Sequence, residues 1–305
     1  MAYSFLSLVV ACSWRRVWAH ARGLGLDRAA DVLFGLRIFP LIAAALTTAS
    51  LAVPSFLLLE PRVIDEPIGG VSVALVVCGL TLGLVGSMSA IIALRRAARA
   101  VAEWTRGARV AGSADSVPVL TISPVSPAMT AAGIFRPRIL LSGVAELQLT
   151  GSELQAALKH ELAHVRRADN LKKLLMRFVT FPGMRGLEAA WLETTEMAAD
   201  AAAVSTISGA LDLATALIKL SRLAPQMAAT ALTAPLIHGR PSALHARVER
   251  LMGWSEEQCE APVNHSLLYG LGLGLTATFG VIGITALTCS TLLVHIHMAT
   301  EWLVR

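Results

Sequence analysis

Two histidines and a glutamate in the stretch LKHELAHVRRADN, residues 158–170, have the spacing of a zinc site. His160 and His164 are about one helical turn apart, so their imidazoles would lie on one side of a helix and could take two corners of a tetrahedral zinc site. Glu161 would lie beside them, where its carboxylate can take a proton from a zinc-activated water. This HExxH signature of zinc hydrolases predicts one catalytic Zn²⁺ with Glu161 as the general base.

A catalytic zinc ion needs a third protein ligand, and the later segment ETTEMAADAAAV, residues 193–204, offers candidates. Glu196 and Asp200 are four residues apart and would share a helical face. The residues around them are small, which would let two helices approach closely. Glu193 is three residues before Glu196 and nearly on the same face, so spacing alone leaves it as the rival third ligand.

A purely structural interpretation of these residues is also open. An HExxH match by itself is weak, because the pattern also occurs by chance. His160 and His164 would then be surface histidines on a basic helix, and the later carboxylates would form an ordinary solvated face. The second helix favours the metal site, because it supplies a carboxylate at a suitable spacing.

Capping signals and periodicity predict the helices that must position these residues. Thr150 and Glu153 have the spacing of a capping box, which predicts the start of a helix that runs through the HExxH residues. A second long helix is expected from about 187 to 208. Further helices are expected at 210–223 and 242–253.

A short β element is expected ahead of the HExxH helix. Residues 117–143 combine β-branched residues with prolines and a glycine, which predicts strands and turns. The whole central segment, 95–262, is therefore expected to be a mainly α cytoplasmic domain that carries the zinc site.

The composition is that of a membrane protein. Of the 305 residues, 55% are hydrophobic and 15% are charged, and the mean hydropathy is +0.63. This is too apolar for an ordinary soluble domain. The four cysteines are scattered and form neither a disulfide framework nor a metal knuckle. Few aromatic residues and no basic recognition helix argue against direct nucleic-acid binding.

Three apolar runs without charged residues are long enough to cross a hydrocarbon core of about 30 Å. They are residues 38–59, 67–94 and 266–294. The N-terminal segment 1–18 is a weaker fourth span, and its positive charge follows the apolar residues, which favours an uncleaved anchor. Residues 1–94 would then form an N-terminal membrane region, with the lipid bilayer as a partner.

The distribution of arginine predicts the topology. Five arginines lie between the first two spans and five more follow the third, whereas the loop at 60–66 is mostly acidic. The positive-inside rule therefore puts the segment 95–262 in the cytoplasm, and both chain ends, including the tail 295–305, outside. We expect a multi-pass protein of the bacterial inner membrane.

The charges around the motif also exclude a metal site within the bilayer. The lysine and arginines beside the histidines, with Asp169, would be too costly inside hydrocarbon. Gly79–Gly83 and Gly270–Gly274 have GxxxG spacing, which favours close packing of spans and leaves a homo-oligomer through the spans open.

The longer stretch GIFRPRILLSGVAELQLTGSELQAALKHELAHVRRADN resembles the BlaR/MecR-type membrane metallopeptidases, which regulate β-lactam resistance genes in bacteria. The shared features are an arginine–proline strand at 136–138, the HExxH helix, Asp169 after it, and a later ExxxD helix from Glu196 to Asp200. The likeness extends to the spans at 38–94 and to ALHARVERLMG, so it covers most of the chain.

This resemblance implies a gluzincin-like fold, shared with the membrane CAAX-prenyl and heat-shock proteases. It implies Glu196 as the third zinc ligand, and Asp169 and Asp200 as carboxylates that hold the ligating histidines. Such carboxylates fix the tautomer of a histidine and raise its basicity. It also implies a protein or peptide substrate, with a transcriptional repressor as the candidate.

Two departures from the family pattern change what we expect. The segment TFPGMRG, residues 180–186, stands where this family tends to carry an Asn-Pro pair followed by a tryptophan. Sensor members carry a penicillin-binding domain after the last span, whereas this chain stops at Arg305. We therefore expect no direct sensing of a β-lactam by acylation.

Candidates for substrate binding and for an oxyanion donor are also present. An extended substrate could pair with the strand formed by Ile139, Leu140, Leu141 and Ser142. The same residues could equally form a core strand that is buried under the helix and does not contact substrate. The central segment has no tyrosine, so the oxyanion candidates are an arginine, His238 or His245.

Together these features predict a membrane-anchored zinc endopeptidase that cleaves a cytoplasmic regulator or another protein. Two alternatives stay open: a catalytically inactive membrane scaffold or signalling relative, and a membrane protease of protein quality control. The intact Glu161 argues against the inactive form.

Overall fold

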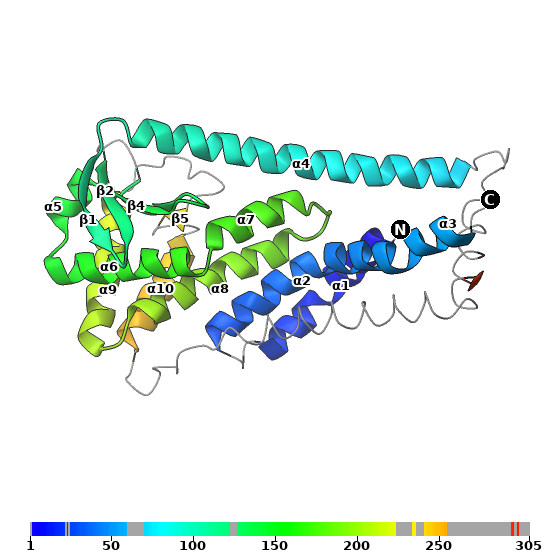
Figure 1. Cartoon of the computed structure of the whole chain (residues 1–305). Helices are drawn as coiled ribbons and strands as arrows, with labels where there is room; N and C mark the ends of the chain where they lie inside the picture. Colours follow the sequence, from blue (N-terminus) through cyan, green and yellow to red (C-terminus); the bar gives the residue numbers. More distant parts are fainter. Residues whose placement is uncertain are drawn as a thin grey trace.

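The structure, a computed structural model, describes residues 2–21, 23, 25–59, 70–122, 127–223, 234–235 and 241–254, with 294, 295 and 298 (Figure 1). Helices dominate these residues, and one small sheet lies at one end of the molecule. The expected C-terminal span at 266–294, the tail at 295–305 and His238 lie outside the described residues, apart from the three isolated positions.

Long apolar helices form the N-terminal part of the chain. α1 (Ala2–Ala21) is followed by α2 (Leu26–Thr47). α2 continues through a π-helical turn (Thr48–Ala52) into α3 (Val53–Leu59). α4 (Gly70–Trp104) lies along the other side of the molecule, where it passes α7 and reaches the sheet (Figure 1).

Two of these helical stretches, Leu26–Leu59 and Val73–Trp104, are long and apolar enough to cross a membrane. They contain most of the spans expected at 38–59 and 67–94, but α2 begins earlier and α4 ends later than those runs. The extension of α4 is rich in alanine and arginine, which both favour helix, and its arginines lie beyond the uncharged run. α1 is a helix, as expected for 1–18, but is not among the stretches that are long and apolar enough.

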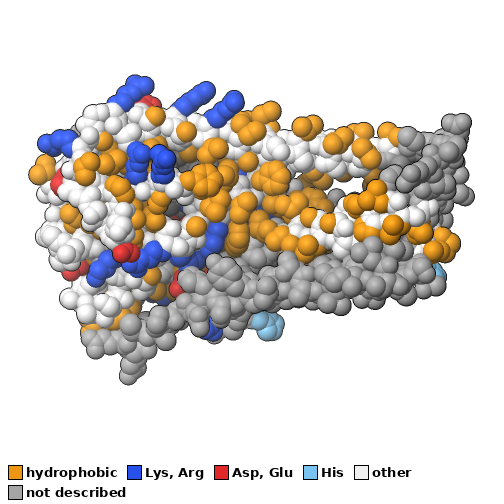
Figure 2. Space-filling model, viewed as in Figure 1, with side chains coloured by type: hydrophobic (Ala, Val, Ile, Leu, Met, Phe, Trp, Pro, Cys, Tyr) orange, Lys and Arg blue, Asp and Glu red, His pale blue; other side chains and the backbone are white. Residues whose placement is uncertain are grey.

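Exposed side chains divide the molecule into an apolar part and a charged part. α4 exposes apolar side chains over much of its length, among them Val76, Leu80, Leu84 and Met88. In Figure 2, lysine and arginine side chains gather toward the end that carries the sheet, and apolar side chains cover the described surface of the other half. Such an apolar surface is unfavourable in water, so this half fits a lipid bilayer.

A five-stranded sheet precedes and flanks the HExxH helix. Its strands, in the spatial order β1-β2-β4-β3-β5, are β1 (Arg109–Ala114), β2 (Val117–Ile122), β4 (Arg138–Ser142), β3 (Met129–Ala132) and β5 (Ala234–Pro235). β2 and β4 are parallel, and the other neighbours are antiparallel. The strands expected within 117–143 are present. The sequence pattern does not predict β1, because RVAGSA is exposed and lacks apolar alternation.

β4 is a central strand of this sheet. β2 and β3 pair with its two sides, and its residues 139–142 are at most 3% exposed. The prediction that Ile139, Leu140, Leu141 and Ser142 pair with an extended substrate is therefore wrong, because neighbouring strands occupy both edges. The alternative, a buried core strand, is correct.

Six further helices lie after β4 in the described part of the chain, the last of them after β5: α5 (Gly143–Gln148), α6 (Gly151–Arg166), α7 (Asp169–Phe178), α8 (Arg185–Ala203), α9 (Ile207–Leu223) and α10 (Pro241–Met252). The predicted capping box is confirmed, since Thr150 and Glu153 accept hydrogen bonds from each other's backbone N–H. α8 ends at Ala203 and not at 208, because Val204 is extended and the Thr206 side chain caps the start of α9.

Two separate apolar cores position the helices. In the first, α6 and α9 pack against the sheet, with Ile139 and Leu213 fully buried. In the second, α1 and α2 pack against α7 and α8, where Leu33 of α2 meets Leu187 and Trp191 of α8. The N-terminal helices therefore hold the first half of α8, and the second half is free to face α6.

The turn between α7 and α8 packs against both α1 and α4. Tyr3 Oη donates a hydrogen bond to Thr180 O at 2.8 Å. Gly86 of α4 faces the carbonyl oxygen of Phe178 so closely that a methyl group at Gly86 would collide with it. Glycine is therefore required for this close approach. At Gly79–Gly83, where GxxxG spacing predicts packing, no described atom lies within 4 Å of either Cβ position.

We expect Gly86→Ala to destabilise the protein and Gly79→Ala to leave it as stable or more stable. Overpacking of the kind expected at Gly86 costs about 1–3 kcal/mol. At Gly79, alanine should gain up to about 1 kcal/mol of helix propensity without a collision among described residues. Thermal unfolding of both variants in detergent measures the difference. An unchanged or raised unfolding temperature for Gly86→Ala would contradict the packing of α4 on Phe178.

Candidate metal centre

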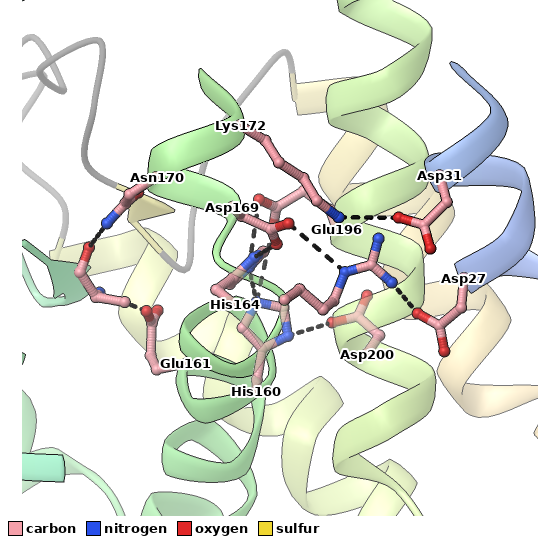
Figure 3. Close-up of polar contacts among 12 residues, drawn as sticks. Asp27, Asp31, His160, Glu161, His164, Asp169, Asn170, Lys172, Glu196 and Asp200 are labelled. Carbon is pink, nitrogen blue, oxygen red and sulfur yellow. Dashed lines mark hydrogen bonds and ion pairs between the residues drawn. The ribbon is translucent and has the colours of Figure 1, made fainter. Parts of the chain in front are cut away.

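α6 and α8 bring three side chains together that could hold a metal ion (Figure 3). His160 and His164 lie on the buried side of α6, with their Nε2 atoms 3.1 Å apart. Glu196 of α8 places Oε2 3.7 Å from His160 Nε2 and Oε1 3.6 Å from His164 Nε2. All three side chains are buried.

A carboxylate holds the far side of each histidine ring. Asp200 Oδ1 lies 2.9 Å from His160 Nδ1, and Asp169 Oδ2 lies 2.7 Å from His164 Nδ1. Because an ionised carboxylate only accepts hydrogen bonds, the Nδ1 of His164 carries the hydrogen and donates it to Asp169, and the contact of His160 Nδ1 with Asp200 favours the same tautomer. The Nε2 lone pairs of the neutral rings therefore point into the cluster. The structure therefore places Asp200 and Asp169, the two carboxylates that the family resemblance implied, against the two histidines.

The separations between these atoms fit a tetrahedral metal site. Zinc bonds to histidine nitrogen and carboxylate oxygen are about 2.0–2.2 Å long, which puts neighbouring ligand atoms about 3.4 Å apart. The two imidazole nitrogens are 3.1 Å apart, and they lie 3.7 and 3.6 Å from different oxygens of Glu196. With one ligand atom from each residue, all three atoms lie within 4.8 Å of one another. Two lone pairs and a carboxylate would repel one another in a buried site without a cation. Two histidines and one carboxylate are also the donor set of catalytic zinc sites.

Burial distinguishes Glu196 from Glu193, the two candidate third ligands that sequence spacing leaves equal. Glu196 is buried against α6, whereas Glu193 is exposed. Three residues of an α-helix correspond to a rotation of about 300°, so the two side chains leave the helix about 60° apart. The structure therefore places Glu196 in the cluster and Glu193 outside it.

Arg247 of α10 neutralises the carboxylates of α8. Its Nε and Nη2 donate to the two oxygens of Asp200, both at 2.7 Å, and its Nη1 donates to Glu196 Oε2 at 3.0 Å. Burial alone would raise the pKa of each carboxyl group. The charges of the histidines and of Arg247 instead hold the pKa of Glu196 and that of Asp200 below their ordinary values. Against the effect of burial, the same contacts raise the pKa of Arg247.

His160 holds a proton strongly when no metal competes for it. Burial would lower its pKa, but hydrogen bonds to Asp200 and Glu196 raise the pKa to about 9. Metal ligation requires the neutral imidazole, so a metal ion must displace this proton. The same carboxylates that favour the proton would favour a metal cation in its place.

Glu161 lies beside the ligands but points toward the sheet (Figure 3). Its Oε2 accepts a hydrogen bond from Ala131 N of β3 at 2.5 Å, and its Oε1 has no hydrogen-bond partner among the described residues. Burial raises the pKa of Glu161, and the charges of the two histidines partly oppose this. A buried carboxylate with one unengaged oxygen and a raised pKa suits a general base that works near neutral pH.

Sequence patterns did not indicate three buried polar residues of this site: Arg247, Asn170 and Lys173. Asn170 Nδ2 donates to Ala131 O at 3.1 Å, which ties α7 to β3. Lys173 is buried one turn further along α7, and burial lowers its pKa. Asp169, Asn170 and Lys173 lie on one side of α7. Their spacing in the sequence was the signal that could have indicated a buried polar face. Polar residues on a helix are usually assigned to solvent, which hides such a face.

His245 is not part of the cluster. Its ring lies on the exposed side of α10 and pairs with Glu249 at 3.1 Å. His245 is two positions before Arg247, so the two side chains lie on different sides of the helix. The prediction of His245 as an oxyanion donor is therefore wrong.

The ligand set and the buried glutamate define the class of a metal-dependent hydrolase. Residues 68–251, more than half of the chain, match the family described as BlaR1 peptidase M56. The chain belongs to this family, which confirms the resemblance found in the sequence, and it is a membrane-associated metallopeptidase. The match covers the site residues described above and omits α1, α2 and α3. No curated protein matches the chain.

We expect Arg247→Gln to destabilise the metal-free protein strongly. The substitution leaves Asp200 and Glu196 without their buried counter-charge, and loss of one partner of a buried ion pair costs about 3–5 kcal/mol. Zinc should restore part of the loss, because it brings positive charge to the same carboxylates. Thermal unfolding with and without zinc measures both effects. Arg250→Gln, an exposed arginine of the same helix, is the control, and an equal loss in both variants would contradict the role of Arg247.

Proposed function

We propose that the chain is a membrane-anchored, zinc-dependent endopeptidase that cleaves a cytoplasmic protein, with a transcriptional repressor as the candidate substrate. The convergence of His160, His164 and Glu196, with Glu161 beside them, is the observation that carries this proposal. The arginine distribution supports a cytoplasmic site, since the positive-inside rule places the segment after α4 on that side.

The residues of the site have separate roles in the proposed reaction. Zinc, when bound, would supply Lewis-acid activation of water and of the substrate carbonyl. His160, His164 and Glu196 would hold the ion, and Asp169 and Asp200 keep the two imidazoles in the ligating tautomer. Glu161 would accept the proton of the attacking water through its unengaged oxygen and deliver it to the leaving amine.

β3, and not β4, is the strand that borders the site. Ala131 of β3 donates to Glu161 and accepts from Asn170. On the side away from β4, the two described residues of β5 pair with Thr130 and Ala131 of β3. An extended substrate that adds to this edge would have to displace β5. Because β3 carries the backbone groups next to Glu161, we infer that an extended substrate would bind along β3 and not along β4.

Three glutamate-to-glutamine variants test the proposal. The full-length chain is purified in mild detergent, its zinc content is measured, and cleavage of casein and of repressors encoded beside its gene is followed. Glu161→Gln should retain zinc but lose about 10²–10⁴-fold in rate, as expected for removal of a general base. Glu196→Gln should lose zinc and activity together. Glu193→Gln, exposed on the same helix, should retain both.

The outcomes separate the proposal from its alternatives. Stoichiometric zinc without cleavage of any candidate would favour an inactive membrane scaffold. A wild-type chain that binds no zinc would contradict the peptidase. Cleavage that survives in Glu161→Gln would overturn the role of that residue. Cleavage of casein and other unfolded proteins, with none of the repressors, would favour a quality-control protease.

A further inference from the structure

Three ion pairs attach α2 to α6, α7 and α8. They are Asp27–Arg167, Asp31–Lys172 and Arg37–Glu188. The helix that makes them is apolar and belongs to a stretch long enough to cross a membrane. α2 also lies outside the region that matches the peptidase family, so the match assigns no role to Asp27, Asp31 or Arg37.

One of the three pairs leads to a candidate metal ligand (Figure 3). Arg167 Nη1 contacts Asp27 Oδ1, and Arg167 Nε lies 3.6 Å from Asp169 Oδ1. The other oxygen of Asp169 accepts the hydrogen bond from His164 Nδ1. The side chains of Arg167 and Asp169 are 8% and 0% exposed, so solvent and salt screen the contact between these two residues little.

The backbone between Arg167 and Asp169 is held in an unusual conformation. Ala168 has a φ of +53°, in the left-handed region, which is unfavourable for a residue with a side chain. This residue forms the turn between α6 and α7 and lets Asp169 reach back to His164. A strained residue persists where surrounding contacts determine its conformation, and the pair between Asp27 and Arg167 is one such contact.

We propose that Asp27 is a positioning residue of the metal centre that acts through Arg167 and Asp169 on His164. Asp27 engages the guanidinium on the side away from Asp169, which leaves Asp169 available to His164. Without Asp27, Arg167 would pair more closely with Asp169 and compete with the imidazole for that carboxylate. The ring of His164 would then be a less basic and less firmly oriented ligand.

The inference rests on the proposed zinc site and adds a role for α2. The peptidase centre is completed by a residue from an N-terminal apolar helix, and the position of that helix helps to set metal affinity. A shift of α2 relative to α6 would weaken the hold on His164, since the pair between Asp27 and Arg167 joins the two helices.

Zinc affinity of matched variants tests this role. The zinc dissociation constant of the full-length chain in detergent is measured by competition with a chromogenic chelator, well below the unfolding temperature. Asp27→Asn should weaken zinc binding about tenfold, the lower end of the effect of groups that support metal ligands. Asp31→Asn is the control, because it breaks the neighbouring ion pair of the same helix. It should lower the unfolding temperature similarly and leave zinc affinity unchanged.

A double variant separates positioning from general destabilisation. In an Arg167→Gln background, Asp27→Asn should cause no further loss of zinc affinity, because both residues act through one link. Asp27→Glu should retain most of the wild-type affinity. Wild-type affinity in Asp27→Asn, or an equal loss in Asp31→Asn, would overturn the inference and leave the zinc site intact. A wild-type chain that binds no zinc would overturn the proposed function and this inference with it.

Discussion

Three electron-pair donors, the Nε2 atoms of His160 and His164 and the carboxylate of Glu196, are held within 4 Å of one another in the protein interior. Such a group is unfavourable unless a cation lies among the donors and unless rigid neighbours hold them. The neighbours are present: carboxylates fix the two imidazoles from behind, and Arg247 holds the carboxylates of α8. Much of the surrounding structure can be understood as support for this one arrangement.

The support extends to helices that lie far from the site in sequence. The first half of α8 is packed against α1 and α2, where Trp191 and Leu187 are buried, and the second half carries Glu196. The turn before α8 is enclosed by α1 and by Gly86 of α4. The apolar N-terminal helices therefore do more than attach the peptidase to a membrane. They position the helix that brings Glu196, the third candidate ligand, to the two histidines.

Local patterns in the sequence predicted the parts of the structure that depend on local interactions. The capping box at Thr150 and the helical spacing of the motif depend on neighbours within one or two turns. The choice between Glu196 and Glu193 depends on which side of α8 meets α6, which spacing does not determine. Strand order decides that residues 139–142 are a core strand, and Arg247 reaches the site from a helix 51 residues beyond Glu196. Such contacts between distant segments leave little trace in a single sequence.

We propose that His160, His164 and Glu196 hold one zinc ion. Zinc X-ray absorption spectroscopy of the purified full-length chain is the direct test. We expect about four nitrogen or oxygen ligands at 2.0–2.2 Å, with the scattering pattern of two imidazoles and no sulfur. Sulfur at about 2.3 Å, or a shell of six oxygens without imidazole, would show that the metal is bound elsewhere and would contradict the site described here.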